Sequence, residues 1–349
     1  MTVLYFGLYD PSYARNWVLI NGLKKNGINV IELRRKPGRF AVIRLFFDYV
    51  RLRKRFDAMV VGFPGQEVMF LARILTRKPL IFDVFTSHYG GYILDRQKFT
   101  KNSWRAEYYK FLDKWSCKLA DAVLLDTKAH IDFFVREYNL PPQIFKRIWA
   151  GANDDFFKPV ASIPSQDKFH VLFFGTYIPL QGIEYIVRAA KILESESDIV
   201  FTLVGRGQEY EKIQKLSLEL NLKNVEFRPM MEPERLRDEI VNCSISLGIF
   251  GNTPKTAIVI PNKVFMGVAM KKAVITADTP AIRELFGEND LWMVPRADGE
   301  ALAQAILRLK RDVAIRENLA QGGYNKFAKF ASHEALGREL KGIIENIIQ

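Results

Sequence analysis

A strand, a polar loop, a helix and a second strand follow one another between residues 245 and 276, and this order restricts the fold more than any other feature. Ile245 to Phe250 is an apolar run, a helix opens at Pro261-Asn262-Lys263, and Ala273 to Thr276 is a second apolar run. This order predicts a βαβ unit of a parallel sheet. Unpaired N–H groups at a helix N-terminus favour anions. Two interpretations stay open: Lys263 belongs to a cradle for a nucleotide diphosphate, or it is a solvated lysine on a buried amphipathic helix.

The chain has 349 residues, which exceeds the length at which single hydrophobic cores stop growing, so two domains are expected. The formal net charge of +12 favours an anionic partner: nucleic acid, a membrane surface or a phosphorylated substrate. Cys117 and Cys243 lie far apart in apolar contexts, and we expect both to be reduced core residues of a cytosolic protein. The chain starts directly with a strand and lacks a run of about 18 uncharged apolar residues, which predicts neither a signal peptide nor a membrane span.

The first residues repeat the strand–helix–strand pattern. Val3 to Gly7 reads as a buried strand, Ser12 to Lys25 has apolar residues at helical spacing, and Ile28 to Leu33 is the next strand. Only Gly7 and then Asp10-Pro11 follow the first strand, so the glycine fingerprint of dinucleotide dehydrogenases is missing. The N-terminal half is therefore predicted to be a parallel α/β domain of another kind.

Residues 34–55 hold nine basic residues and one acid, Asp48, and read as a helix from Phe40 onward. Apolar residues fall on one side and basic residues on another, a pattern typical of helices that lie in a membrane interface. The alternative is a helix that packs its aromatic face on the sheet and leaves its arginines in water. No nucleic-acid-binding motif accompanies this segment, so nucleic acid is not expected as a partner. The residues predicted to contact an anionic membrane are Arg44, Arg51, Arg55, Phe46 and Phe47.

Two acidic residues end predicted strands of the N-terminal half. Asp83 follows the strand from Pro79, and Asp126 follows the strand from Ala122, so both are expected at the same edge of the sheet. Each could belong to a site or could cap the next helix. The segment between Asp83 and Trp104 reads as a long polar loop that contains His88, Asp95 and Arg96; such loops are usually functional or disordered.

A second series of strands and helices begins after the aperiodic stretch from Gly151 to Lys168, which reads as a linker. Its first two strands end at Gly175 and Gly205, where we expect the backbone to approach a ligand closely. Together with Arg206 and the helix at Asn262, these glycines predict a phosphate crevice. The tail from Gly299 to Gln349 reads as helical and could return to the N-terminal domain.

The sequence resembles the retaining glycosyltransferases of family 4 (glycosyltransferase group 1). The stretches that carry the resemblance are FFGTYIPLQGIEYIVRAAKIL (173–193), LVGRGQEY (203–210), IPNKVFMGVAMKKAVITADTPAIREL (260–285), LLDTKAHIDFFVREYNLP (124–141) and AGANDDFFKP (150–159). The resemblance implies the GT-B fold, which is an α/β architecture with two Rossmann-like domains facing across a cleft. It implies an acceptor domain at 1–157, a linker at 158–168, a nucleotide-sugar domain at 169–325, and a C-terminal helix at 326–349 that packs back on the first domain.

The resemblance also implies roles for particular residues. The diphosphate would meet the first strand's end and the helix at Asn262, and the nucleobase would meet the backbone at Pro229-Met230. His88 would lie near the reacting carbon, as the first candidate for a catalytic base, and Asp83 is the second. The implied donor-site residues are Gly7, Gly175, Thr176, Gln181, Gly182, Gly205, Arg206, Gly207, Pro229, Met230, Asn262, Lys263 and Met266.

Three positions depart from the family pattern. Thr176 and Gln181 stand where members often carry a basic pair, and Ile258 and Met266 stand where members tend to carry two glutamates. The second glutamate normally binds the ribose hydroxyls, and a thioether cannot replace that acceptor. Losing such a charge-assisted hydrogen bond, about 1.5–3 kcal/mol, would weaken donor binding about tenfold or more. The chain has no Asp-x-Asp motif and no metal-site spacing of histidines and cysteines, so neither a metal nor another cofactor is expected.

The function that the resemblance implies is transfer of a sugar from a nucleotide-sugar to a glycan or lipid-linked acceptor, with retention of the anomeric configuration. The basic helix suggests cell-envelope polysaccharide or glycolipid assembly by a cytoplasmic protein that is peripheral on the inner face of the membrane. Two alternatives remain. The missing glutamates favour a non-catalytic glycosyltransferase-like subunit, and the architecture is also shared with nucleotide-sugar epimerases.

Overall fold

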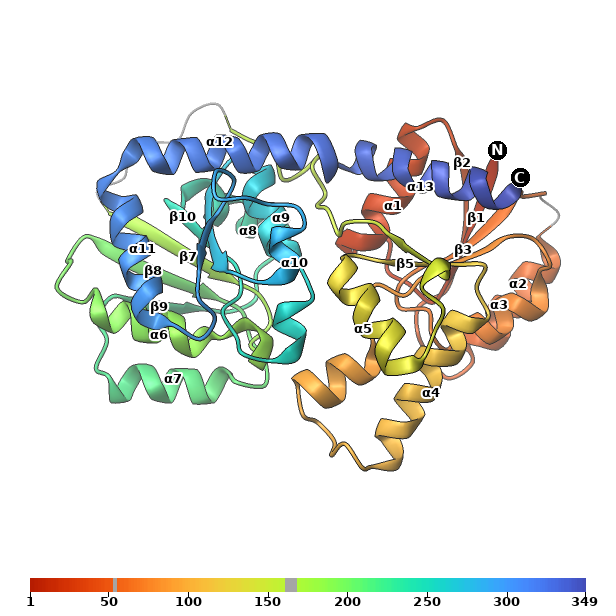
Figure 1. Cartoon of the computed structure of the whole chain (residues 1–349), viewed down its shortest axis with the longest axis horizontal. Coiled ribbons are helices and arrows are strands. Elements are labelled where there is room, and N and C mark those ends of the chain that lie inside the picture. Colours follow the sequence, from red (N-terminus) through yellow and green to blue (C-terminus); the bar gives the residue numbers. More distant parts are fainter. Residues whose placement is uncertain (53–54, 161–167) are drawn as a thin grey trace. The chain divides into compact units, whose positions relative to one another are not determined.

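A computed structural model describes residues 1–52, 55–160 and 168–349, and these divide into two compact units (Figure 1). Unit 1 comprises Met1–Asn153 and Phe330–Gln349, and unit 2 comprises Asp154–Lys329. Most of the predicted linker, residues 161–167, lies outside the described residues, as do residues 53 and 54 of the basic segment. Among the described helices, none combines the length and the apolar character needed to cross a bilayer.

Unit 1 is built on a parallel sheet in the order β2-β1-β3-β4-β5-β6. The central strands are short apolar runs buried along their whole length, as expected where helices cover both faces of a parallel sheet. The strands are β1 (Thr2–Gly7), β2 (Asn29–Arg34), β3 (Ala58–Val61), β4 (Leu80–Asp83), β5 (Ala122–Leu125) and β6 (Phe145–Arg147).

The helices of unit 1 begin where the sequence supplies a capping side chain or a turn. Ser103, Thr127 and Ser332 each accept a hydrogen bond from the backbone three residues onward and so start α4, α5 and α13. The elements are α1 (Ala14–Lys25), α2 (Ala41–Arg51), α3 (Met69–Leu75), η1 (Gly90–Asp95), α4 (Trp104–Lys118), α5 (Lys128–Tyr138), η2 (Pro142–Ile144) and α13 (His333–Ile348).

The C-terminal helix α13 packs on α1 within unit 1, as the resemblance implied. A Cβ added at Gly22 would lie 2.3 Å from the His333 carbonyl oxygen, and one at Gly337 would lie 2.1 Å from the Gly22 backbone. Only glycines allow two helix backbones to approach this closely. Asn26 donates a further hydrogen bond of 2.9 Å to the Glu334 carbonyl.

Unit 2 repeats the architecture with the strand order β12-β11-β10-β7-β8-β9. Its strands are β7 (Phe169–Phe174), β8 (Ile199–Val204), β9 (Val225–Arg228), β10 (Ile245–Leu247), β11 (Ala273–Ala277) and β12 (Trp292–Val294). The helical elements are η3 (Pro179–Gln181), α6 (Ile183–Ile192), α7 (Tyr210–Glu219), α8 (Pro233–Asn242), η4 (Pro254–Ala257), α9 (Asn262–Ala269), α10 (Pro280–Arg283), α11 (Gly299–Arg311) and α12 (Val313–Phe330).

A single large cluster of fully buried side chains, including Phe173, Phe201 and Ile275, forms one side of the unit 2 core. Each such side chain contributes about 1.5–3 kcal/mol relative to an exposed one, so this cluster fixes the sheet. Both cysteines are free and buried, as predicted. The fold is therefore the expected α/β fold with two Rossmann-like units.

Candidate functional site

Lys263 is the residue around which the candidate site of unit 2 is arranged. It stands in the first turn of α9, and its side chain is buried, with 6% of the residue exposed. Its Nζ donates a hydrogen bond of 2.6 Å to Gln181 Oε1 and lies 3.6 Å from the centre of the Phe173 ring. The interpretation of Lys263 as a solvated lysine is therefore wrong.

The Lys263 ammonium group has no carboxylate partner among the residues that the structure describes. Burial disfavours its charged form and lowers the pKa of Lys263 well below its ordinary value. A buried cation costs several kcal/mol unless an opposite charge compensates it. An anionic ligand would supply that charge, because Gly175 leaves open the position beside the ammonium group: a Cβ there would lie 3.0 Å from Lys263 Nζ.

The glycines of the predicted phosphate crevice lie where neighbouring loops approach one another closely. A Cβ at Gly205 would lie 2.0 Å from the Gly175 carbonyl oxygen, and one at Gly207 would lie 2.6 Å from the Tyr177 carbonyl oxygen. Tyr177 donates its N–H to the Arg206 carbonyl across 2.9 Å. Gly182 has φ +64°, and a Cβ there would lie 2.4 Å from the Gly251 nitrogen. At Gly205, the close approach that was expected toward a ligand is thus an approach toward a neighbouring loop, and Gly207 and Gly182 make contacts of the same kind.

Further predicted donor-site residues lie exposed at the same edge of the sheet. Thr176 follows β7, Arg206 follows β8, and Pro229 and Met230 follow β9; all four are exposed. The Arg206 guanidinium lies 3.9 Å above the Tyr210 ring, which holds it in place by a cation–π contact. The structure therefore brings exposed polar and apolar groups to the ends of three adjacent strands, above the buried Lys263.

The two positions of the missing glutamates are occupied by apolar packing. Ile258 packs against a cluster that contains Leu180 and Ile249, and Met266 packs against one that contains Phe174. Asn262 is half-buried at the first position of α9, whose side-chain cap is absent. The N–H groups of this first turn remain available to an anion.

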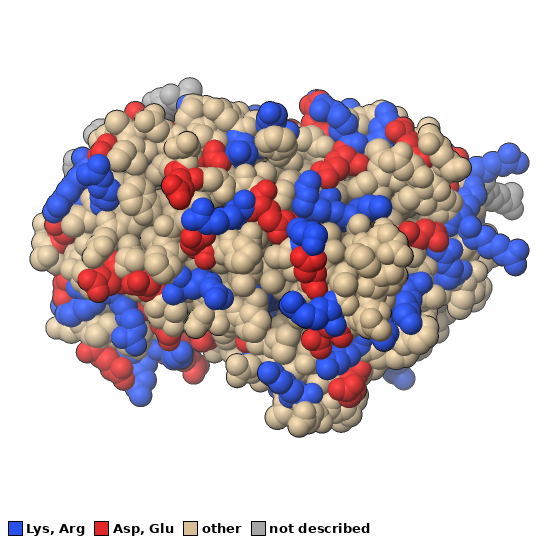
Figure 2. Space-filling view, viewed as in Figure 1, with Lys and Arg blue, Asp and Glu red and all other residues tan. Residues whose placement is uncertain are grey.

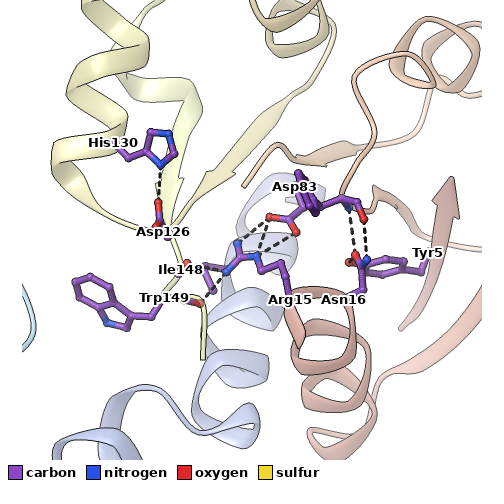
Figure 3. A network of polar contacts seen from close by, with 9 residues as sticks. Tyr5, Arg15, Asn16, Asp83, Asp126, His130, Ile148 and Trp149 are labelled. Atoms are coloured by element: carbon purple, nitrogen blue, oxygen red, sulfur yellow. Dashed lines mark hydrogen bonds and ion pairs between the residues drawn. The ribbon is translucent and has the colours of Figure 1, made fainter. Parts of the chain in front are cut away.

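Asp83 of unit 1 forms a fully buried ion pair with Arg15 (Figure 3). Arg15 Nη2 lies 2.8 Å from Asp83 Oδ1, and Arg15 Nη1 donates to the carbonyls of Ile148 and Trp149 at 2.8 and 2.7 Å. Burial raises the pKa of the Asp83 carboxyl, while Arg15 acts in the opposite direction. Asp83 therefore faces an arginine and neither caps a helix nor meets solvent, so the geometry gives no support to its role as a base.

Asp126 is also buried, and its Oδ1 lies 2.7 Å from His130 Nδ1 (Figure 3). The residue that caps α5 is Thr127, whose hydroxyl accepts the His130 N–H at 3.0 Å. The cap that was expected at Asp126-Thr127 is thus formed by the Thr127 hydroxyl. This side chain orients the His130 ring on the first turn of the helix.

The segment between Asp83 and Trp104, which was expected to be a long loop, contains the helical element η1, and His88 lies just before it. Asp113, a buried residue of α4, anchors this short loop at the start of η1. The Asp113 carboxylate accepts the N–H groups of His88 and Tyr89 at 3.0 and 2.9 Å, and the hydroxyls of Ser87 and Tyr138 at 2.7 and 2.9 Å. Sequence reasoning missed Asp113, because an acid inside an amphipathic helix looks like a solvated residue.

The His88 ring is half-buried and lies beside Glu67. Its Nε2 lies 3.4 Å from Glu67 Oε1, and this contact lowers the pKa of Glu67. Two buried polar atoms nearby, Gln66 Oε1 and Thr86 Oγ1, have no hydrogen-bond partner among the described residues. Gly7, with φ +146°, ends β1 at the same edge of the sheet. This edge thus carries unsatisfied polar groups that a polar ligand could bind.

The basic helix α2 exposes the residues that were predicted to contact a membrane. Only Ala41 and Leu45 of α2 are buried, whereas Phe46 and Phe47 are 37% and 52% exposed and Arg44 and Arg51 are exposed as well. Arg55, beyond the helix, is also exposed. The alternative that α2 packs its aromatic face on the sheet is therefore wrong.

Residues 168–312 match the family model described as "Glycosyl transferases group 1". The chain is 24% identical over 250 residues to an alpha-D-kanosaminyltransferase of Streptomyces kanamyceticus, which covers 68% of this chain and 64% of that protein. It is 29% identical over 191 residues to the lipopolysaccharide core biosynthesis glycosyltransferase LpsD of Rhizobium meliloti (strain 1021), which covers 51% of this chain and 50% of that protein. These matches span between half and two thirds of the length of the two relatives.

Solved structures share the fold of the whole chain. The structure of Anabaena Alr3699/HepE in complex with UDP has a TM-score of 0.73 at 14% identity and covers 99% of this chain and 100% of that one. Sucrose-phosphate synthase (tll1590) from Thermosynechococcus elongatus has a TM-score of 0.76 at 16% identity and covers 99% and 98%. At these identities the likeness shows the fold alone.

Proposed function

We propose that the protein is a glycosyltransferase, because residues 168–312 match the family model of the glycosyl transferases group 1. It moves a sugar from a nucleotide-sugar donor to a hydroxyl group of a glycan or lipid-linked acceptor, with retention of configuration. Unit 2 binds the donor and unit 1 binds the acceptor. The relatives' names, which include a lipopolysaccharide core glycosyltransferase, favour a role in the assembly of cell-envelope polysaccharide or glycolipid.

One observation carries the donor proposal: Lys263 is a buried cation without a carboxylate partner among the described residues, placed at a helix N-terminus beside Gly175. A donor diphosphate has the negative charge that this position lacks. Gln181, which stands where a basic residue was expected, holds the ammonium group at 2.6 Å and so fixes its direction. The neutral residue therefore positions the cation instead of adding a second one.

The reaction requires that the leaving diphosphate be stabilised as its bond to the sugar breaks. Lys263, the N–H groups of the first turn of α9 and Arg206 supply positive charge at the ends of the strands, and we propose that they do so without a metal ion. On the acceptor side, His88 is the candidate base. Asp113 holds the backbone on which His88 stands, and Glu67 lies close enough to orient its ring.

A second candidate function is a glycosyltransferase-like subunit that has lost catalysis. The observation that favours it is the apolar packing of Ile258 and Met266, which leaves no carboxylate at either position. The position of Lys263 opposes it, because a buried cation without a partner is costly to retain unless a ligand compensates its charge. The two candidates differ in whether sugar is transferred.

The test measures thermal unfolding of the purified chain against a panel of nucleotides and nucleotide-sugars. A ligand present at 100 times its dissociation constant adds about 2.7 kcal/mol of stability. The stabilising nucleotide-sugar is then incubated with glycan and lipid-linked acceptors, and the product linkage is analysed by NMR. Stabilisation, followed by formation of a product that keeps the anomeric configuration of the donor sugar, supports transfer. Stabilisation without a product on any acceptor supports the non-catalytic subunit, and no stabilisation contradicts the donor site.

A further inference from the structure

Helices α2, α3 and α4 form one layer on one face of the unit 1 sheet. The strand order requires the connections β2–α2–β3, β3–α3–β4 and β4–α4–β5 to run in one direction, so right-handed crossovers place these helices side by side. The contacts agree: the Tyr49 hydroxyl donates to the Leu75 carbonyl at 2.9 Å, and the rings of Phe70 and Phe111 stack at 6.2 Å. The outer surface of these helices is therefore continuous.

A stripe of exposed aromatic side chains runs along the outer side of α4. Trp104, Tyr108, Phe111 and Trp115 stand four, three and four residues apart, which places them on one side of the helix. Their residues are 72%, 45%, 48% and 42% exposed. The opposite side of α4 already supplies the core, through Ala106, Leu112 and Cys117 among others. The stripe is therefore additional to what folding requires.

The neighbouring helices continue this stripe. Ile74 of α3 is 80% exposed, and Ile43, Phe47 and Val50 of α2 are 55%, 52% and 61% exposed. Large exposed apolar patches are uncommon on a protein that remains in water and indicate an interaction site. We call the outer surface formed by these four residues and the α4 stripe the apolar face of unit 1. More than half of the exposed large apolar side chains among the described residues lie on or beside α2, α3 and α4.

Cationic side chains border the apolar face. Lys118 Nζ lies 4.7 Å above the Trp115 ring, and the Arg105 guanidinium lies 5.1 Å from the Trp104 ring. Within the described part of the chain, Arg44 and Lys118 form no ion pair with a carboxylate, and Arg51 acts at longer range on Asp48, which is ion-paired with Arg35. Figure 2 shows Lys and Arg side chains projecting at the end of unit 1 where α2 lies. An apolar surface surrounded by uncompensated positive charge is complementary to a surface that carries negative charge.

We propose that the apolar face of unit 1 binds the surface of an anionic lipid bilayer, with the α4 stripe inserted among the lipid headgroups. Tryptophan and tyrosine prefer this interfacial depth, and lysine and arginine near an anionic bilayer contribute on the order of 1 kcal/mol each. A glycan is the competing ligand for this face. Sugars stack on aromatic rings, whereas Ile43, Val50 and Ile74 are aliphatic and suit the boundary of acyl chains.

The apolar face lies next to the loop that carries His88, the candidate base. The Tyr109 ring of α4 lies 5.9 Å from the His88 ring, so the N-terminal half of α4 stands beside the candidate base. A bilayer on the apolar face would therefore bring lipid-linked acceptors to the His88 loop. This inference rests on the proposed function for the identity of the acceptor, whereas the membrane contact itself depends only on the apolar face.

The experiment uses the full chain and vesicles of phosphatidylcholine, with or without phosphatidylglycerol. We expect co-sedimentation with the anionic vesicles only, weakened by added salt. Tryptophan emission should shift to the blue on binding, because Trp104 and Trp115 are exposed in water. The double variant Trp104→Phe/Trp115→Phe should bind vesicles but lose the shift, which would locate the inserted residues.

The variant Trp104→Ser/Trp115→Ser should bind anionic vesicles at least about tenfold more weakly, since two apolar rings are lost from the interface. The matched control is Ile192→Ser/Leu218→Ser, which removes two apolar residues of unit 2 that are 52% and 80% exposed; it should bind as the unchanged chain does. Equal unfolding temperatures of the two variants exclude misfolding as the cause.

Three results would overturn the proposal: no binding to anionic vesicles, full binding by the Trp104→Ser/Trp115→Ser variant, or a blue shift produced by soluble maltooligosaccharides without vesicles. The last result would assign the face to glycans. The donor proposal is tested separately, because Lys263→Met should bind vesicles normally. Vesicle binding without nucleotide binding would contradict the donor site alone, and the reverse would contradict the membrane surface alone.

Discussion

Lys263 Nζ donates its hydrogen bond to Gln181 Oε1, a neutral acceptor 82 residues earlier in the chain, and not to a carboxylate. This pairing directs the ammonium group without neutralising it. A lysine in a buried ion pair would be occupied before any ligand arrived, whereas this amine remains available to an anion at the ends of the strands. The neutral residue at position 181, which departs from the family pattern, thereby becomes part of the candidate donor site.

Replacing Lys263 by methionine should remove donor binding with little loss of stability. Removing the buried charge offsets the cost of leaving Gln181 Oε1 without its donor, so we expect the free energy of unfolding in urea to change by less than about 1 kcal/mol, compared with about 3–5 kcal/mol for breaking a buried ion pair. Stabilisation by the nucleotide-sugar should vanish, and sugar transfer should fall about 100-fold or more. Lys215→Met, at an exposed lysine of unit 2, is the control and should behave as the unchanged chain does.

Donor binding should take up a proton. Burial lowers the pKa of Lys263, so in the empty site the amine loses its proton at a lower pH than an exposed lysine does. A bound diphosphate favours the charged form and raises that pKa again, so affinity should weaken as the pH rises through the lowered pKa. Calorimetry in two buffers of different ionisation enthalpy measures the uptake. A binding enthalpy that is the same in both buffers, at a pH above the lowered pKa, would show that the amine does not meet the ligand.

Asp83 and Arg15 should prove structural. Asp83→Asn leaves the buried guanidinium without its counter-charge and should lower the free energy of unfolding by about 3–5 kcal/mol. Arg15→Met/Asp83→Leu should cost less than the sum of the two single changes, because the pair is removed as a unit. Turnover per folded molecule of Asp83→Asn, measured at a temperature where it stays folded, should remain near the wild-type value. A loss of turnover without a loss of stability would instead make Asp83 the base.

The fold could be predicted from the sequence because it depends on local patterns. Short apolar runs and helical periodicity are properties of neighbouring residues, and they indicated both sheets. The differences between prediction and structure lie at the ends of strands and helices, where a distant or polar partner decides at which residue the element begins or ends. Strand β6 ends at Arg147, and the carbonyls of the next two residues accept hydrogen bonds from Arg15, a residue far away in the sequence. The helix expected from Ser12 begins at Ala14, because Ser12 turns back to hydrogen-bond Asp10.

The candidate site was predictable in position but not in its contacts. The ends of the strands and the start of α9 indicated one edge of the sheet as the candidate site, yet nothing local pairs Lys263 with Gln181 or Arg15 with Asp83. The stripe on α4 shows a further limit. Its spacing is that of a core-facing helix, and only the burial of the opposite side shows that the aromatic residues face outward.

Asp113 should act on catalysis through the position of His88. Asp113→Asn removes an acceptor from the N–H groups of His88 and Tyr89 and from two hydroxyls, so we expect a loss of about 2–3 kcal/mol in the free energy of unfolding. The kcat for sugar transfer should fall because the loop no longer holds His88, while stabilisation by the nucleotide-sugar, which depends on unit 2, should be unchanged.

Tyr138→Phe removes one hydroxyl donor to the same carboxylate and leaves the loop backbone bonded, so it should lower stability by about 1 kcal/mol and spare kcat. If both variants lose stability but transfer sugar at the wild-type rate, His88 is not the base, and the unpaired groups of Gln66 and Thr86 become the next residues to change.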